Sequence, residues 1–508
     1  MSPRRLLGLI VLSVLALWLH QFLFETSVLP KPLWRSNVVD RAAIASTLPL
    51  DLPENSTLVW SLNYCGQCTG FAVEAYDFVI PLAESYAPGA MGFVNGNRHA
   101  SHSKCTCPGY SRTDVALLER ASAAMPALTR RRIDVWVEHQ PPPVYPRFVG
   151  AYTTSTGLVV RRRPLWVVGR SMCEAQRVRA DWVPHLKRVD EVWVPSRFLI
   201  DAFALAGAPR EKLVLIPEAV HPAFFETPMP ELFGGGGGGA KRFVFLAVGK
   251  WEARKGLDEL VAAYVCEFDS RDPVVLVLKT FLYQQYDGKN EAKVRAHATR
   301  VGLQARAQQC PRVRGPLPAF KIITGRDIGV YEMAELYSRA HAFVLPTRAE
   351  GWCLPCTQAL AAGLPTIVTN WSGPADFMSD EHSFPLSISG VGPARGKFWT
   401  RDQHWAVPNA THLRALMRDV YANHGGALAR GVRARAFARA QYDRARVATA
   451  VAQRLQAIVA SPPFLARRDE WERSRGALAA DEARAARWEA AVDRRKTLEI
   501  IAFLTGRS

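Results

Sequence analysis

Two series of short apolar segments, separated by six consecutive glycines, constrain the fold of this 508-residue chain more than any other feature. Polar stretches with helical character separate the segments, and such alternation predicts βαβ units built on parallel sheets. The glycines, Gly234–Gly239, fit no packed element and predict a linker. We therefore expect two Rossmann-like, doubly wound α/β domains that face a cleft, with ligands beyond the carboxyl ends of the strands. The predicted strands are 57–62, 133–139, 164–169, 191–196 and 212–217 before the glycines, and 242–249, 274–280, 321–325, 342–347 and 365–369 after them.

The N-terminus carries an uncharged apolar stretch, Leu6–Phe24, directly after Arg4 and Arg5. At the helical rise this stretch spans about 28 Å, close to the hydrocarbon thickness of a bilayer. The two arginines keep the N-terminus cytosolic and send the rest of the chain into a lumen. A cleaved signal peptide is the alternative, but the stretch is long for one and no small-residue cleavage pattern follows closely. We expect a cytosolic tail at 1–5, a transmembrane signal anchor at 6–24 and a stem at 25–55, as in a single-pass type II protein of the Golgi or endoplasmic reticulum.

The formal net charge of +18 could serve nucleic acid, an acidic membrane face or anionic substrates. Lys and Arg are spread along the chain and form no stripe interleaved with aromatic residues, so we expect no nucleic-acid partner. Three N-glycosylation sequons, at Asn55, Asn370 and Asn409, suit a luminal chain.

The cysteines also permit an oxidising compartment. Cys65 and Cys68 form a C-x-x-C pattern, and Cys105 and Cys107 form a C-x-C pattern near His102. Zinc could bind such a set, but in a lumen disulfides are the expected use. The chain has nine cysteines, so at least one is free or paired with another chain. The pairing cannot be read from the sequence.

Two loops carry the candidate chemistry. The first, Val248–Gly256 ("VGKWEARKG"), leaves a predicted strand and opens a helix, where Lys250, Arg254 and Lys255 could neutralise a phosphate beside free backbone N–H groups. The second places Glu350 at the corresponding position after a later strand, so both loops should project over one edge of the sheet. Glu350 could accept hydrogen bonds from sugar hydroxyls, or it could simply cap the next helix. A dehydrogenase-type glycine fingerprint and a Walker P-loop are both absent here.

These two loops resemble the C-terminal domain of retaining glycosyltransferases of family 4, a group related to glycogen and sucrose synthases. The resemblance rests on "VGKWEARKG" and on "AFVLPTRAEGWCLPCTQALAAGLPTIVTNWSGPADFM", and it extends to 168–225, 330–346 and 404–423 in the family's order. It covers about Thr57 to Val459. The resemblance implies a GT-B fold, in which the N-terminal domain holds the acceptor, the C-terminal domain holds a nucleotide-sugar, and a late helix crosses back.

By this resemblance, Lys250 and Lys255 match the basic pair that holds the donor diphosphate, and Glu350 matches the first Glu of the family's E-x7-E motif, which faces the transferred sugar. Gly351 and Trp352 match the turn that lines the donor pocket. The second Glu of the motif, which binds the ribose, falls on Gln358. An amide can still make hydrogen bonds to the ribose without the charge. Cys353 stands where the family often has Gly.

In the N-terminal half, Gly66 and Gly70 resemble the family's glycine loop, where the chain approaches the donor. His139 ends a predicted strand and resembles the family's active-site His that touches the donor sugar, although an isolated loop His is more often structural. Arg170 and Glu174 are candidates for the acceptor side.

The resulting division is 56–226 for the N-terminal acceptor domain, 227–241 for the linker, 242–425 for the nucleotide-sugar domain, 426–460 for crossover helices and 461–508 for a charged helical extension. We expect a retaining hexosyl- or pentosyltransferase that moves a sugar from a UDP- or GDP-sugar to a glycoprotein, glycolipid or polysaccharide. We expect no cofactor and no metal, because no Asp-x-Asp motif stands where one would be needed. The alternatives are a luminal sugar-nucleotide- or glycan-binding pseudoenzyme and a sugar-nucleotide epimerase.

Overall fold

A computed structural model describes residues 50–62, 70–95, 109–149, 151–154, 156–233, 242–283, 289–313, 315–324, 328–396 and 398–474. The predicted tail, the anchor at 6–24, most of the stem and the glycine run lie outside these residues, as do Cys65, Cys68, Cys105 and Cys107. None of the helices within the described ranges has both the length and the apolar character needed to cross a bilayer. The anchor at 6–24 therefore stays a prediction.

The N-terminal domain is built on a six-stranded parallel sheet in the order β2-β1-β3-β6-β7-β8. Helices cover both of its faces, which explains why its strands are continuous apolar runs. β2 was not among the predicted strands. The strands are β1 (Leu58–Leu62), β2 (Met91–Asn95), β3 (Val135–His139), β6 (Trp166–Arg170), β7 (Glu191–Val194) and β8 (Leu213–Leu215), with a small hairpin of β4 (Tyr152–Thr153) and β5 (Val159–Val160).

The C-terminal domain repeats the plan with a second parallel sheet in the order β11-β10-β9-β12-β13-β14. The order reverses between β9 and β12, the kind of switch point at which doubly wound folds bind ligands. Two parallel α/β sheets were expected, and the structure confirms them. The strands are β9 (Phe243–Val248), β10 (Val274–Lys279), β11 (Ala319–Ile323), β12 (Ala342–Leu345), β13 (Thr366–Thr369) and β14 (Phe384–Leu386), followed by an antiparallel hairpin of β15 (Ile388–Pro393) and β16 (His404–Pro408).

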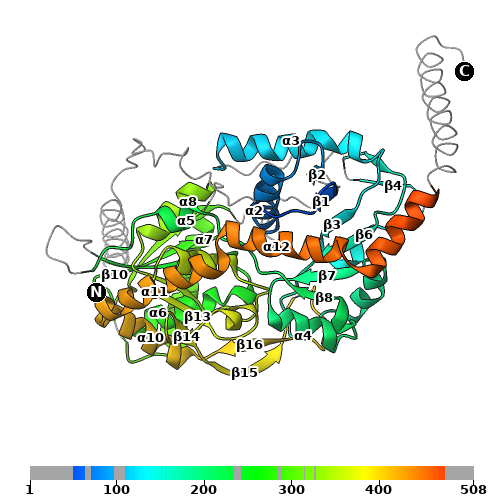
Figure 1. The fold of residues 1–508 in the computed structure, drawn as a ribbon. Coiled ribbons are helices and arrows are strands. Elements are labelled where there is room, and N and C mark those ends of the chain that lie inside the picture. The colour runs from blue at the N-terminus through cyan, green and yellow to red at the C-terminus, as the bar shows by residue number, and fades with distance from the viewer. Residues whose placement is uncertain are drawn as a thin grey trace, which may run out of the picture.

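The helices surround these two sheets (Figure 1). Those of the N-terminal half are α2 (Gly70–Ser85), α3 (Arg112–Leu128) and α4 (Arg197–Leu205). Those that follow are α5 (Ala223–Glu226), α6 (Leu257–Glu267), α7 (Glu291–Gln308), α8 (Val330–Ser338), α9 (Leu354–Ala361), α10 (Ala410–Ala422), α11 (His424–Tyr442) and α12 (Arg444–Val459). Short 3₁₀ helices are η1 (Pro142–Val144), η2 (Ala180–Arg188), η3 (Arg210–Lys212), η4 (Ala253–Lys255) and η5 (Gly373–Asp376).

The chain passes from the first sheet to the second earlier than the sequence suggested. β8 ends the first sheet, whereas Val220 and the phenylalanines of α5 pack in the core of the C-terminal domain. The crossing is therefore 216–222, before the glycine-marked segment 227–241. The predicted boundary fell on the wrong side of α5, because six consecutive glycines are a stronger sequence signal for a linker than residues 216–222.

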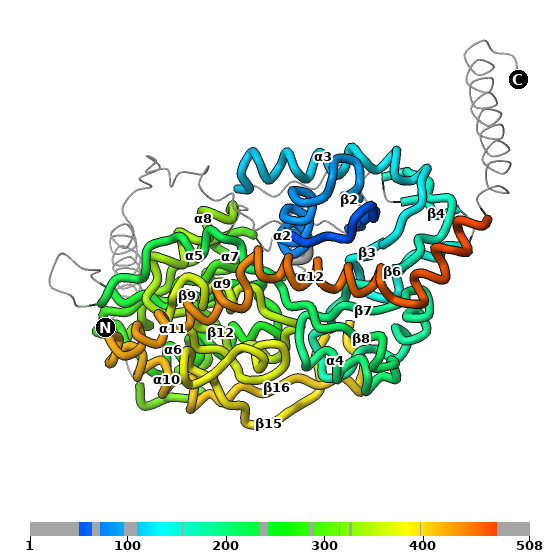
Figure 2. Tube along the Cα trace, viewed as in Figure 1, coloured from blue at the N-terminus to red at the C-terminus, as the bar shows by residue number. Residues whose placement is uncertain are grey.

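The return crossing is made by the last helices. The crossover helices expected at 426–460 are α11 and α12, which are divided at Asp443. The Asp443 carboxylate accepts a hydrogen bond from the Ala445 N–H and caps α12. α12 then leaves the C-terminal domain and packs along α2 of the N-terminal domain (Figure 2). The first part of the charged extension, up to residue 474, is helical and continues this packing through Phe464 and Trp471.

Candidate active site

Two loops meet at the switch point of the C-terminal sheet. β9 and β12 are parallel neighbours, and their carboxyl ends lead into the loops that precede α6 and α9. A hydrogen bond joins the loops, because the Arg348 N–H donates to the Arg254 carbonyl at 2.7 Å. Gly256 has a φ of +67°, and a Cβ there would lie 2.0 Å from the Pro346 carbonyl oxygen, so only glycine fits this close approach.

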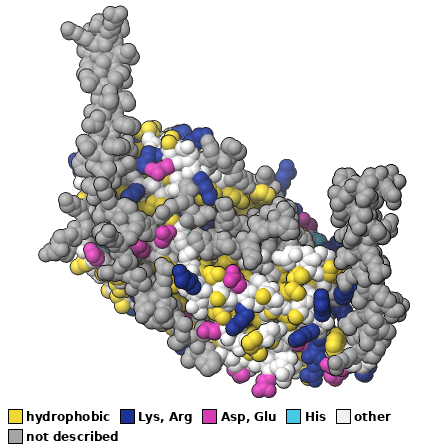
Figure 3. All heavy atoms as spheres, turned by 90° about the horizontal axis from the view of Figure 1, so that it is seen from above, with side chains coloured by type: hydrophobic (Ala, Val, Ile, Leu, Met, Phe, Trp, Pro, Cys, Tyr) yellow, Lys and Arg dark blue, Asp and Glu magenta, His cyan; other side chains and the backbone are white. Residues whose placement is uncertain are grey.

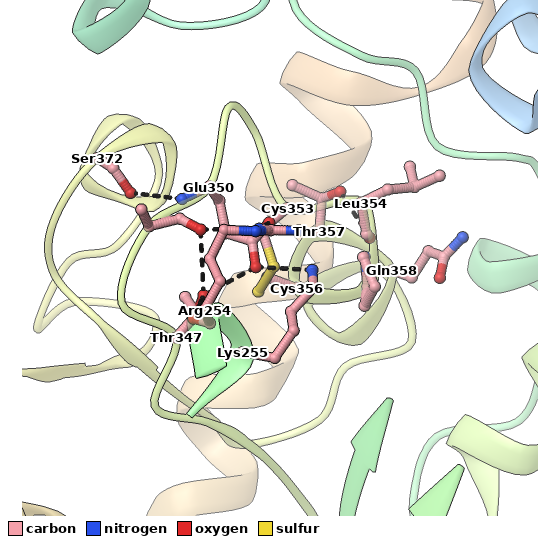
Figure 4. The surroundings of a disulfide bond; sticks show 12 residues. Arg254, Lys255, Thr347, Glu350, Cys353, Leu354, Cys356, Thr357, Gln358 and Ser372 are labelled. Atoms are coloured by element: carbon pink, nitrogen blue, oxygen red, sulfur yellow. Dashed lines mark hydrogen bonds and ion pairs between the residues drawn. A yellow bond between two sulfur atoms is a disulfide. The ribbon is translucent and has the colours of Figure 1, made fainter. Parts of the chain in front are cut away.

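Glu350 lies at the centre of this junction (Figure 4). Its Oε1 accepts from Lys255 Nζ at 2.7 Å and from Thr347 Oγ1 at 2.8 Å, and its Oε2 accepts from Arg254 Nη1 at 2.7 Å. Glu350 is 4% exposed, and both cations are buried as well. The carboxylate therefore forms a buried salt-bridge cluster in which every charge is paired with an opposite one, which is a condition for such a cluster to be tolerated.

The charges in this cluster are fixed at neutral pH. Burial alone would raise the pKa of Glu350, but the Arg254 and Lys255 cations, with hydrogen bonds from Lys255 and Thr347, outweigh it and lower the pKa to about 2. Burial alone would lower the pKa of the Arg254 guanidinium, but the Glu350, Glu174 and Glu252 carboxylates outweigh this effect and raise that pKa. The Lys255 ammonium has three N–H donors, so its bond to Glu350 leaves donors for a ligand.

The turn after Glu350 is held from two sides. Ser372 Oγ accepts from the Glu350 N–H at 2.9 Å, and the Gly373 N–H donates to the Glu350 carbonyl at 3.0 Å. Cys353 follows with a φ of +99°, a backbone conformation that favours glycine. A disulfide joins Cys353 to Cys356 in the first turn of α9. The N–H groups of Cys353 and Leu354 make no hydrogen bond within the described part of the chain, so this helix start offers donors to an anion.

Three further predicted donor residues take different places. Lys250 Nζ lies 4.5 Å from the centre of the Tyr283 ring, so Arg254 rather than Lys250 joins Lys255 at Glu350. Trp352 is buried beneath the turn, with its ring centroid 5.0 Å from that of Tyr442, and so it packs in the core instead of lining an open surface. Gln358 points away from Glu350, and its Oε1 accepts from Tyr337 Oη at 3.4 Å (Figure 4).

A second polar cluster lies inside the N-terminal domain, at the carboxyl ends of β3 and β6. Glu74 of α2 accepts from Arg170 Nε at 2.7 Å and faces His139 Nε2 at 3.1 Å. Burial of Glu74 would raise the pKa of its carboxyl, but Arg170 and His139 lower it. Trp60 Nε1 donates to His139 Nδ1 at 3.4 Å, so both ring nitrogens of His139 are engaged, and its exposure is 0%. In this structure His139 orients Glu74 and has no face open to a sugar.

The two domains touch at the turn of Glu350. Ser196 Oγ, at the start of α4, donates to the Gly351 carbonyl at 2.8 Å, and Arg254 Nη2 lies 3.6 Å from Glu174 Oε1. A Cβ on Gly351 would lie 3.0 Å from Met172 Cβ, so a glycine permits the close approach of the domains. The candidate acceptor residue Glu174 thus contacts the donor-side cation, whereas Arg170 serves Glu74.

Gly66 lies outside the described residues, and Gly70 is the first residue of α2. Within the described residues no group of three or more His, Cys, Asp or Glu side chains is arranged to hold a metal ion. On the face shown in Figure 3, Lys and Arg side chains are scattered among hydrophobic and acidic ones. Glu74, Thr347 and Ser372 were not assigned roles from the sequence. Arg254 was expected as a candidate cation for a phosphate, and in the structure it pairs with Glu350.

Comparisons with solved structures show a shared fold. HepE of Anabaena in complex with UDP and glucose superposes with a TM-score of 0.53 at 12% identity, covering 79% of this chain and 100% of HepE. Sucrose-phosphate synthase of Thermosynechococcus elongatus superposes with a TM-score of 0.54 at 15% identity, covering 80% of this chain and 99% of the synthase. The chain has a GT-B fold.

A third GT-B structure, WaaG, a glycosyltransferase involved in lipopolysaccharide biosynthesis, superposes with a TM-score of 0.50 at 14% identity, covering 78% of this chain and 99% of WaaG. Residues 324–385 match the family model of the group 1 glycosyl transferases. This segment contains β12, Glu350, α9 and Gln358. No curated protein sequence matches the chain significantly.

Proposed function

We propose that the chain is a retaining glycosyltransferase of family 4 that moves a hexosyl or pentosyl group from a nucleotide diphosphate sugar to an acceptor hydroxyl. The observation that carries the proposal is the cluster of Glu350, Lys255 and Arg254 at the switch point of a GT-B fold. Its two cations and the open amides before α9 provide positive potential where a diphosphate would leave. The match of residues 324–385, which contain Glu350 and α9, to the group 1 glycosyl transferases supports this assignment.

In the proposed reaction the bond between the anomeric carbon and the diphosphate oxygen breaks, and the acceptor oxygen bonds to the same face of that carbon. The acceptor proton passes to the departing diphosphate. Lys255 and the α9 amides stabilise the charge that develops on the leaving group, a contribution that mutagenesis places at about 10²–10³ in rate for a single donor elsewhere. Glu350 holds Lys255 and Arg254 in position, and its remaining lone pair can accept a hydrogen bond from the sugar.

The donor is proposed to be a UDP- or GDP-sugar, since the HepE structures hold UDP, glucose or UDP-glucose. The acceptor is proposed to be a glycoprotein, glycolipid or polysaccharide, in keeping with the proposed Golgi or endoplasmic reticulum location and the anchor at Leu6–Phe24. Protease protection of the full chain in sealed microsomes tests this orientation: the catalytic part should resist protease until detergent is added. Cleavage without detergent would contradict it.

The function is tested by incubating the full chain, purified in mild detergent, with a panel of nucleotide-sugars and acceptors, and by following nucleoside diphosphate release and the anomeric configuration of the product. Glu350→Ala should reduce transfer at least about 100-fold. Glu335→Gln, which alters an exposed pair with Arg339, is the matched control and should retain wild-type rates. An inverted product would refute retention, and equal rates for wild type and Glu350→Ala would refute the proposed role of Glu350.

A binding protein without turnover is the second candidate, favoured by two observations. Gln358 replaces the second carboxylate of the family motif, and Glu350 is already occupied by two cations and a hydroxyl. The same assay separates the candidates: saturable nucleotide-sugar binding without release of diphosphate would favour the binding protein. An isomerised nucleotide-sugar formed without acceptor would indicate an epimerase.

A further inference from the structure

Glu218 is a buried carboxyl on the first crossing between the domains. The crossing is clamped at both ends: Arg170 Nη1 donates to the Ile216 carbonyl at 2.5 Å, and the Val220 N–H donates to the Tyr442 carbonyl at 2.7 Å. Glu218 lies between these clamps and is 4% exposed. Its position is therefore set by both domains at once.

Glu218 is also unpartnered. Within the described residues the Glu218 carboxyl makes no hydrogen bond and no ion pair. By contrast, the charged groups of the Glu350 and Glu74 clusters are all paired. An isolated, buried, ionised carboxylate is costly, and such a group keeps its proton instead. A carboxyl that is 4% exposed and has no partner among the described residues can still bond to a ligand.

The surroundings of Glu218 join the two halves of the site. Glu218 interacts electrostatically with Glu74 and Arg170 of the N-terminal domain and with Glu350 and Lys255 of the C-terminal domain. Burial and the nearby Glu74 carboxylate hold the pKa of Glu218 well above its usual range, Glu350 adds to this, and the Arg170 and Lys255 cations only partly oppose it. The raised pKa favours the neutral acid, which has one O–H to donate.

We propose that Glu218 is a donor-binding residue whose protonated carboxyl donates a hydrogen bond to a diphosphate oxygen of the nucleotide-sugar. This inference rests on the proposed function and adds a residue from the interdomain crossing to it. The chemistry is matched, because a neutral acid bonds an anionic oxygen strongly, whereas an ionised one would repel it. A diphosphate seated on Lys255 would also favour the protonated form, so binding and protonation of Glu218 support each other.

Three variants test the proposal in the full chain. Glu218→Gln keeps the size and an N–H donor but cannot ionise, Glu218→Ala removes the donor, and Glu211→Gln alters an exposed carboxylate on η3 as the control. Affinity for UDP, GDP and inorganic pyrophosphate is measured by calorimetry from pH 5 to pH 9, with uridine as the probe that lacks phosphate. Uridine should show no difference between the variants.

We expect the wild-type affinity for UDP and pyrophosphate to fall as the pH rises through the ionisation of Glu218. Glu218→Gln should remove this fall, and Glu218→Ala should weaken binding about 10- to 100-fold at pH 6, as expected for a lost hydrogen bond to a charged group. Glu211→Gln should follow the wild type. An unchanged pH profile in Glu218→Gln, or an unchanged affinity in Glu218→Ala, would overturn the proposal.

Melting temperatures provide a readout that needs no ligand. Because the folded-state pKa of Glu218 is raised, its stabilising contribution is complete below the unfolded pKa and is lost as the pH rises through the folded pKa. Glu218→Gln should therefore melt higher than wild type at pH 8, with a smaller difference at pH 5. A pH-independent difference would contradict the buried neutral acid. If wild type transfers sugar but the Glu218 variants behave as the control, the function stands and only this inference fails; if wild type binds no diphosphate and transfers no sugar, the proposed function itself fails.

Discussion

Replacing Glu350 by Gln tests whether the buried cluster at the switch point is held by charge. The substitution keeps the side-chain volume and removes the negative charge between Lys255 and Arg254. The pKa of Glu350 is lowered from 4.5 to about 2, a difference of about 2.5, and at 1.36 kcal/mol for each pKa unit this corresponds to about 3 kcal/mol of stability at pH 7. Removing one partner of a buried ion pair typically costs about 3–5 kcal/mol, so the two arguments agree.

The sign of the pH dependence follows from the lowered pKa. The contribution of Glu350 is fully present above its unfolded pKa of 4.5 and is lost as the pH falls through about 2. Thermal unfolding of the full chain, followed by circular dichroism, should show Glu350→Gln melting about 6–12 °C below wild type at pH 7, using about 2–4 °C for each kcal/mol in a domain of this size. The gap should narrow steadily below pH 4.5.

Glu335→Gln supplies the comparison, because the Glu335–Arg339 pair is exposed on both sides, at 49% and 45%. Its loss should change the free energy of unfolding by less than about 0.5 kcal/mol. If Glu350→Gln melts within about 1 °C of wild type at pH 7, the two cations do not depend on Glu350 and the reasoning about the cluster is wrong. A gap that stays constant between pH 7 and pH 3 would equally refute the electrostatic origin.

The remaining predictions concern stability and metal dependence. Cys266→Ser breaks the disulfide to Cys310, which closes 44 residues of chain, and should lower the free energy of unfolding by about 4 kcal/mol in chemical denaturation. Gly256→Ala should destabilise the chain because its Cβ would overlap a carbonyl oxygen, whereas Gly425→Ala, with open space around it in α11, should stabilise it by about 0.5–1 kcal/mol. Burial raises the pKa of Asp77 to about 7, so wild-type stability should fall as the pH rises from 4 to 8, and Asp77→Asn should melt higher than wild type at pH 8 by more than at pH 5. Sugar transfer should persist after EDTA treatment; its loss, restored by a divalent cation, would contradict metal independence.

Most strands of both sheets could be predicted, because parallel strands are buried on both faces and are uninterrupted apolar runs in the sequence; β2 and β14 were missed. β12 was expected at 342–347 and is found at Ala342–Leu345. β2 was missed because Gly92 interrupts its apolar run. A Cβ at this position would lie 2.4 Å from Met125 Sδ, so any other residue would displace that side chain. The position of the break between α11 and α12 was not predicted, because its capping residue, Asp443, stands in a long Ala- and Arg-rich stretch.

The site was predictable only as far as local chain geometry determines it. Loops that follow neighbouring parallel strands must lie side by side, so the approach of Glu350 and Lys255 could be expected, and the structure places their charged atoms 2.7 Å apart. Which cation becomes the second partner depends on how η4 winds, and this gives Arg254 instead of Lys250. His139 ends the predicted strand as expected, but tertiary packing turns its ring toward Glu74, which no sequence spacing could show.

The paths of the two crossings explain why these separate clusters can act together. The first crossing and the return helix touch each other through a bridge between Val220 and Asp443, so the domains are joined at one point by both passages of the chain. Beyond that point, Arg444 reaches Asp77 and Asp114 of the N-terminal domain at 3.5 Å. A movement of one domain must therefore displace this paired segment, and with it Glu218, which lies two residues before Val220. The charged groups that would bind the donor are therefore coupled to the relative position of the two domains through the few residues of the first crossing. This coupling needs no chain of contacts through the domain cores.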